Sequence, residues 1–118
     1  MRAKDALGQY GERVAARHLA DAGLTIVATN WRCTEGEIDI VARDRDVVVF
    51  CEVKTRRSAA FGVPAEAITR TKANRLHRLA MLWLREHPAG AAELRFDVVS
   101  VLLPKAGAPA VEHLPGAF

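Results

Sequence analysis

The pattern of apolar and polar positions divides this chain of 118 residues into two helical and four extended segments. Apolar residues recur at helical spacing over residues 4–22 and again over residues 69–87. Strand patterns rich in β-branched residues occupy four further segments: residues 24–32, 36–43, 46–56 and 93–103. The order helix, three strands, helix, strand predicts an α/β (α+β) protein in which a mixed central sheet is flanked by helices. We also expect a helical turn after Pro64 and a short edge segment at the C-terminal end.

Length and composition favour one soluble domain over residues 1–118, because a chain of this size buries about two thirds of its unfolded surface around one core. About a quarter of the residues (26%) are charged, and no apolar run is long enough to cross a membrane. We therefore expect a cytoplasmic protein. Cys33 and Cys51 lack the CxxC spacing of zinc sites, so both are interpreted as reduced thiols.

Charged residues occur inside two of the predicted strands, where a buried strand is normally apolar. Asp39 lies within "EIDIV", and Glu52 and Lys54 lie within "VVVFCEVK". Residues two apart share one face of a strand, so Glu52 and Lys54 point the same way, and Ile38 and Ile40 share the face opposite Asp39. A hairpin of these two strands brings Asp39, Glu52 and Lys54 together.

Two interpretations fit this convergence. Carboxylates at one point repel unless a cation lies between them, and oxygen ligands favour Mg²⁺ or Mn²⁺, so Asp39 and Glu52 are candidate metal ligands. Lys54 is then placed to orient or activate the attacking water. Alternatively, Glu52 and Lys54 form a simple ion pair at a strand end and Asp39 pairs with an arginine.

The two helices contribute further charged groups on their packed faces. Glu12 lies in the same helical sector as Ala15 and Leu19, so its carboxylate is predicted to face the core and to complete the ligand shell. The second helix has an apolar stripe formed by Leu76, Leu79, Ala80 and Trp83. Lys72, one turn before this stripe, is predicted to point inward.

The positive charge is concentrated in one stretch. Residues 54–85 hold eight basic residues and one acid, a net charge of +7, although the whole chain has a net charge of only +3. Such a stretch is typical of a nucleic-acid-binding surface, although a solvated helix face has the same composition. The candidate nucleic-acid contacts are Arg56, Arg57, Lys72, Arg75 and Arg78.

These residues resemble a known set. An acid in the first helix, an Asp in a hairpin strand and Glu-x-Lys in the next strand are similar to the PD-(D/E)XK nuclease superfamily, particularly the archaeal Holliday-junction resolvases. More of the chain resembles the bacterial YraN-like family of predicted endonucleases. The blocks that carry this closer resemblance are "GERVAARHL", "NWRCTEGEIDIVARD", "VVFCEVKTRR", "FGVPAEAITRTKANRL", "RFDVVSV" and "HLPGAF".

The resemblance implies a restriction-endonuclease-like core in which Glu12, Asp39, Glu52 and Lys54 are catalytic. It places Lys72 at a basic position of the following helix, and Glu37 at a family position without an assigned role. Ile38 stands where the superfamily name has proline. Resolvases act as dimers, so the resemblance also implies a homodimer.

The sequence therefore predicts a divalent-metal-dependent endonuclease that hydrolyses DNA, in preference to RNA, at branched or flapped structures. No element of the chain is an obvious reader of base sequence, which favours recognition of structure. The alternative is a non-catalytic module that retains the nuclease fold and binds nucleic acid or recruits a partner.

Overall fold

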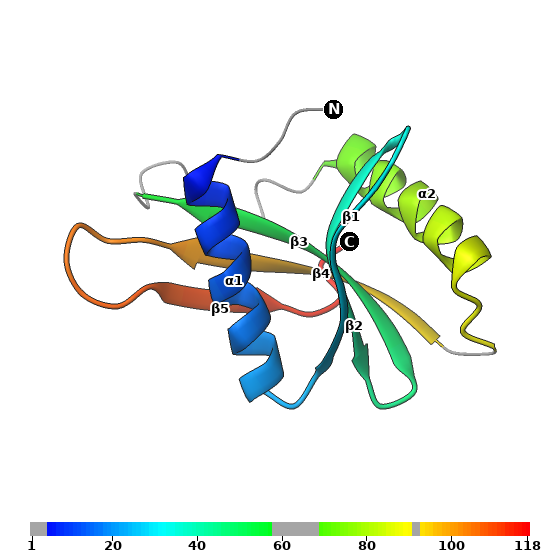
Figure 1. Ribbon diagram of the computed structural model, residues 1–118, viewed down its shortest axis with the longest axis horizontal. Coiled ribbons are helices and arrows are strands. Elements are labelled where there is room, and N and C mark those ends of the chain that lie inside the picture. Colours follow the sequence, from blue (N-terminus) through cyan, green and yellow to red (C-terminus); the bar gives the residue numbers. More distant parts are fainter. Residues whose placement is uncertain (1–4, 58–68, 91–92) are drawn as a thin grey trace.

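The computed structural model describes residues 5–57, 69–90 and 93–118, which form two helices and five strands (Figure 1). Their bounds are α1 Ala6–Asp21, β1 Thr25–Cys33, β2 Gly36–Asp44, β3 Val47–Arg56, α2 Arg70–Glu86, β4 Glu93–Leu102 and β5 Ala110–Leu114. The predicted order of the first six elements is confirmed, with bounds that differ by one or two residues. The helical turn predicted after Pro64 lies outside the described residues.

The strands form one mixed sheet in the order β1-β2-β3-β4-β5. Neighbouring strands are antiparallel except β3 and β4, which are parallel and are connected through α2. The C-terminal edge segment is confirmed as β5, which pairs with β4. β3 is the central strand, and its residues Val48–Cys51 are buried on both faces, as the continuous apolar run predicted.

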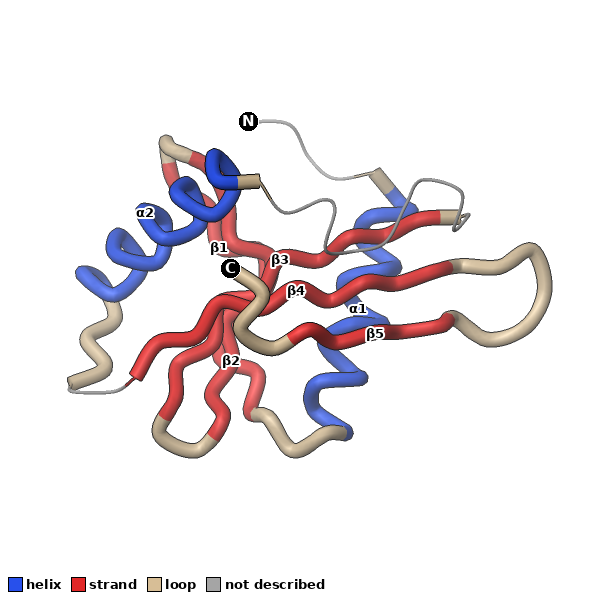
Figure 2. The backbone as a smooth tube through the Cα atoms, turned by 180° about the vertical axis from the view of Figure 1, so that it is seen from behind, coloured by secondary structure: helices blue, strands red, loops and turns tan. Residues whose placement is uncertain are grey.

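The two helices cover opposite faces of the sheet. Ala15 and Leu19 of α1 pack on one face with the buried residues of β2, β3 and β4, and Figures 1 and 2 show α1 before the strands in one view and behind them in the other. The predicted stripe of α2 packs on the opposite face around Phe50. Within the part of the chain that the structure describes, no helix is both long and apolar enough to cross a membrane.

β2 bends at Asp39, and its backbone is paired with β3 only on the C-terminal side of this bend. The ladder between β2 and β3 runs from the turn to the pair Ile40–Cys51 and ends there, whereas β1 stays paired with β2 to the hairpin tip. Ile40 packs on the α1 side, but Ile38 packs on the α2 side. The prediction that Ile38 and Ile40 share a face is therefore wrong, because the bend turns the strand over between them.

α1 lies directly against β3 at one glycine. A Cβ atom on Gly11 would lie 1.9 Å from Thr55 Oγ1 and 2.8 Å from Thr55 Cβ, so only glycine allows this approach. The contact positions the next residue, Glu12, which is buried at 5% exposure, as the helical periodicity predicted. The glycine thus places a carboxylate of α1 beside the point where β2 and β3 separate.

The C-terminal segment is held by a buried carboxylate on β4. Asp97 is fully buried and accepts two hydrogen bonds from Arg95, at 2.9 and 3.0 Å. It also lies 2.7 Å from His113 Nε2 and accepts a hydrogen bond from the Gly116 N–H at 2.9 Å. Arg95 donates a further hydrogen bond to Asp44 at the end of β2. These contacts connect β2, β4 and the chain end.

Candidate active site

The separation of β2 from β3 opens a pocket of about 350 Å³ that the N-terminal half of α2 borders. We call the point where β2 and β3 separate the fork. Asp39 bridges the fork, because its Oδ2 accepts a hydrogen bond of 2.8 Å from the Val53 N–H of β3. The charged residues that line the pocket are Glu37, Asp39, Glu52, Lys54, Lys72 and Arg75. The predicted convergence of Asp39, Glu52 and Lys54 is therefore present in the structure.

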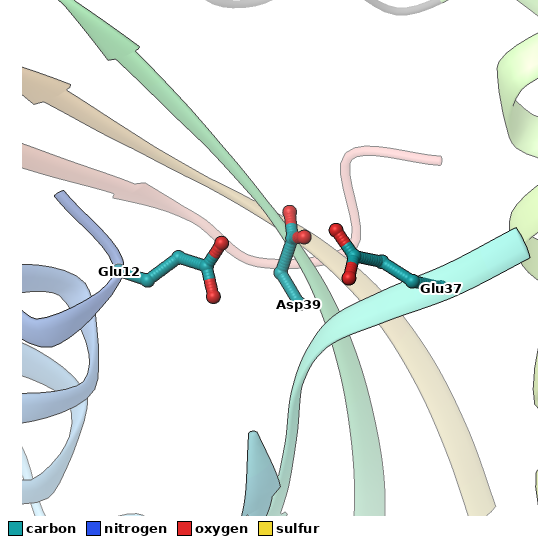
Figure 3. A group of neighbouring side chains, drawn as sticks. All are labelled: Glu12, Glu37 and Asp39. Atoms are coloured by element: carbon teal, nitrogen blue, oxygen red, sulfur yellow. The ribbon is translucent and has the colours of Figure 1, made fainter. Parts of the chain in front are cut away.

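Three carboxylates from two elements meet at the fork. Glu12 of α1 and Glu37 and Asp39 of β2 each offer one oxygen atom, and these three oxygens lie within 4.8 Å of one another. In Figure 3, Glu12 approaches Asp39 from one side and Glu37 approaches it from the other. We call these residues the carboxylate trio.

The carboxylate trio fits a hard divalent cation. Oxygens that bind one octahedral Mg²⁺ at about 2.1 Å lie about 3.0 Å apart when adjacent and about 4.2 Å apart when opposite, so side-chain movements on the order of 1 Å would bring the trio into ligand geometry. Oxygen-only donor sets select Mg²⁺ or Mn²⁺ over softer metals. Glu12 is buried and the other two residues are half-buried, which limits competition from solvent.

Glu52 lies in the same pocket, next to a lysine. Its Oε1 is 3.7 Å from Lys54 Nζ, and both side chains are partly exposed. The ion pair of the alternative interpretation is therefore present. The three oxygens that lie within 4.8 Å of one another include Glu37, whereas the sequence predicted Glu52 beside Asp39 and Glu12. Metal binding by Glu52 stays a prediction, and the pair with Lys54 is compatible with it.

Two lysines stand side by side on the pocket wall. The pKa of Lys72 is lowered, chiefly because the neighbouring Lys54 ammonium favours the neutral form of Lys72, and further by burial and by the charge of Arg75. Glu52 opposes this shift. Lys72 is half-buried and faces the pocket, as its place on the helix predicted. Neighbouring ammonium groups of this kind form a site for an anion such as phosphate.

The predicted arginine contacts have different surroundings. Arg75 lines the pocket, and Arg57 is exposed just beyond the end of β3. Arg56 is half-buried at the last position of that strand. Arg78 is exposed on α2 but forms an ion pair with Glu35 at the tip of the β1–β2 hairpin, so part of its charge is neutralised within the protein.

Sequence reasoning assigned no chemistry to Glu37. The available signal was its spacing, because a residue two positions before Asp39 lies on the same face of the strand. Arg32 of β1 donates a hydrogen bond of 2.9 Å to Glu37 and holds its carboxylate toward Asp39.

Burial raises the pKa of the Cys51 thiol, which supports the interpretation of this residue as an inert core thiol.

Comparison with known proteins identifies the family. A model of "Uncharacterised protein family UPF0102" matches residues 11–101. A UPF0102 protein of Beutenbergia cavernae is 62% identical over 116 residues, covering 98% of each chain. UPF0102 proteins of Frankia alni and Streptomyces griseus are 58% and 56% identical and cover 100% and 98% of this chain, with 98% of each relative matched. The chain belongs to the UPF0102 family.

Proposed function

We propose that this protein is a divalent-metal-dependent endonuclease that hydrolyses phosphodiester bonds in DNA at branched or flapped structures. One observation carries the proposal: a carboxylate trio suited to a cation and a lysine pair suited to an anion border the same fork. Phosphodiester hydrolysis needs both, because the cation and the ammonium groups stabilise the negative charge that develops on the phosphate.

The roles of the residues follow from their positions. Glu12, Asp39 and Glu52 would hold Mg²⁺ or Mn²⁺, with Glu37 of the trio as a further ligand. The bound ion supplies Lewis-acid activation of the phosphate and of water. Lys54 orients the attacking water, whose oxygen forms the new bond to phosphorus while the bond to the leaving sugar oxygen breaks. Lys72 binds a non-bridging phosphate oxygen.

A nucleic acid is the proposed substrate because three basic side chains, Lys54, Lys72 and Arg75, line this pocket, and DNA is preferred to RNA because of the resemblance. Arg75 lines it, and Arg56 and Arg57 continue the basic surface at the end of β3. The resemblance to YraN-like proteins and Holliday-junction resolvases points to branched DNA and to a homodimer. The helix-strand-strand-strand-helix-strand order and the mixed sheet are compatible with that resemblance.

A cleavage assay tests the proposal. Linear, flapped and four-way-junction DNAs are incubated with the protein and Mn²⁺ or Mg²⁺, with EDTA as the metal-free reaction. We expect cleavage of the branched substrates by the wild type, and a loss of at least about a hundredfold for Glu52→Gln and Lys54→Met. Glu86→Gln, at the exposed end of α2, is the matched control that retains activity.

The same DNAs distinguish an endonuclease from the alternative, a non-catalytic module that only binds nucleic acid. A binding module would bind the branched DNAs without cutting them, and Asp39→Asn would bind at least as tightly as the wild type because negative charge is removed. Cleavage that is equal in the wild type and in Glu52→Gln would come from a contaminating nuclease and would contradict the proposal.

A further inference from the structure

A second hollow lies on the other side of Glu12. Its volume is about 360 Å³, and its lining residues are Gln9, Glu12, Arg13, Ala16, Thr29, Asn30 and Arg32. It is formed between α1 and β1, whereas the first pocket is formed between β2, β3 and α2. The proposed function does not use this second hollow.

Two contacts join the hollows through a shared wall. Glu12 lines the second hollow, and its carboxylate is part of the trio with Glu37 and Asp39, which line the first pocket. Arg32 lines the second hollow and donates a hydrogen bond to Glu37. The second hollow therefore adjoins the carboxylate trio on the side of α1 and β1.

The chemistry of the second hollow suits one more nucleotide. Arg13 is exposed and its guanidinium can bind a phosphate bidentately, whereas the Nε of Arg32 already donates to Glu37. Gln9 and Asn30 carry amide groups that donate to and accept from sugars and bases. Tyr10 is 44% exposed on the same helix, and the Arg13 guanidinium lies 5.8 Å from its ring centroid.

We propose that the second hollow binds the nucleotide that flanks the attacked phosphate, with Arg13 contacting its phosphate group. The inference rests on the proposed function, since it names where the DNA strand continues beyond the reacting bond. It assigns nucleic-acid binding to α1, outside the basic stretch of residues 54–85. Arg17, one turn further along α1, is outside the hollow and is paired with Asp21, so it provides a matched control.

The test is equilibrium binding of a fluorescently labelled flapped DNA, measured by anisotropy at several salt concentrations with Ca²⁺ in place of Mg²⁺. We expect Arg13→Ala to raise Kd about fivefold and to reduce the slope of log K against log salt by about 0.7–0.9, the loss of one phosphate contact. Arg13→Lys restores the slope but only part of the affinity, because a lysine cannot bind bidentately. Arg17→Ala binds as the wild type does.

Three outcomes are distinguishable. Weakening by Arg13→Ala with the smaller slope supports the inference. Equal binding by Arg13→Ala and Arg17→Ala, while Lys72→Ala binds weakly, overturns the inference and leaves the proposed function standing. Absence of any DNA binding by the wild type contradicts the proposed function, and the inference is then overturned with it.

Discussion

Glu37 and Arg32 form an ion pair that lies beside the carboxylates of Glu12 and Asp39. The arginine fixes one carboxylate at 2.9 Å, and this carboxylate faces Asp39 and Glu12 across a gap that a small cation would fill. An arginine that held Glu37 for stability alone would not need two further acids nearby. The geometry therefore gives Glu37 a proposed role as a metal ligand.

Removing the charge of Glu37 tests this role. We expect Glu37→Gln to weaken Mn²⁺ binding on the order of tenfold, because one of the proposed anionic ligands is lost. Isothermal titration calorimetry of the wild type and the variant measures the change. Glu35→Gln, two residues earlier in the hairpin and paired with Arg78, is the control that retains Mn²⁺ affinity. Unchanged affinity in Glu37→Gln, together with a loss in Asp39→Asn, would remove Glu37 from the site.

The sequence predicted part of this site because strands have a fixed period. Two-residue spacing placed Glu52 with Lys54 on one face, and the hairpin brought Asp39 near them. The same rule failed at Ile38, since it assumes a regular strand and β2 bends at Asp39. The bend lies where the backbone ladder between β2 and β3 ends and only the Asp39 side chain still bonds to β3, and that position depends on the whole sheet.

At the scale of elements, the contact between α1 and β3 decides whether Glu12 reaches the fork. The helical period predicted the packed faces of both helices, and the stripe of α2 was confirmed residue by residue. The close approach at Gly11 could not be predicted, because it depends on which strand residue lies opposite. Thr55 is 44 residues away in the sequence, and no local pattern connects the two.

A double-mutant cycle tests this contact. Gly11→Ala should lower the free energy of unfolding by about 1–3 kcal/mol, because the added methyl group collides with Thr55 and α1 must shift outward. Thr55→Gly removes the colliding atoms, so the double variant should be less destabilised than the sum of the single changes. Urea denaturation measures all four proteins. Additive effects would show that the helix does not depend on this approach.

At the scale of the whole molecule, the network around Asp97 joins the chain end to the middle of the sheet. Arg95 and Asp97 occupy alternate positions of β4, which periodicity alone would assign to a polar face, yet Asp97 is fully buried. Its hydrogen-bond partners are Arg95 of the same strand, His113 of β5 and the Gly116 N–H after β5, and strand periodicity cannot identify the last two. The backbone N–H of Phe118 also donates to the Phe96 carbonyl, so the segment is fixed at two points.

The network makes stability depend on pH in the acid range. Burial alone raises the pKa of Asp97, but hydrogen bonds from Arg95, Gly116 and His113 outweigh it and hold the pKa below 3.8. The ionised carboxylate is therefore favoured in the folded state. The stability that this carboxylate adds is fully present above about pH 4, near the pKa of Asp in the unfolded chain. It is lost as the pH falls through the lower pKa of the folded state. Hydrogen bonding with Asp97 raises the pKa of Arg95, which stays charged throughout.

Replacing Asp97 with asparagine separates this contribution from that of other acids. At neutral pH, Asp97→Asn should lower the free energy of unfolding by about 1.5–3 kcal/mol, because Arg95 loses its charged partner on β4 and keeps only Asp44. Below pH 4 the wild type should lose stability more steeply than the variant, so the two urea-denaturation curves converge. Asp46→Asn, exposed in the β2–β3 turn, should follow the wild type at every pH. Parallel curves for the wild type and Asp97→Asn would show that the charge of Asp97 does not hold the C-terminal segment in place.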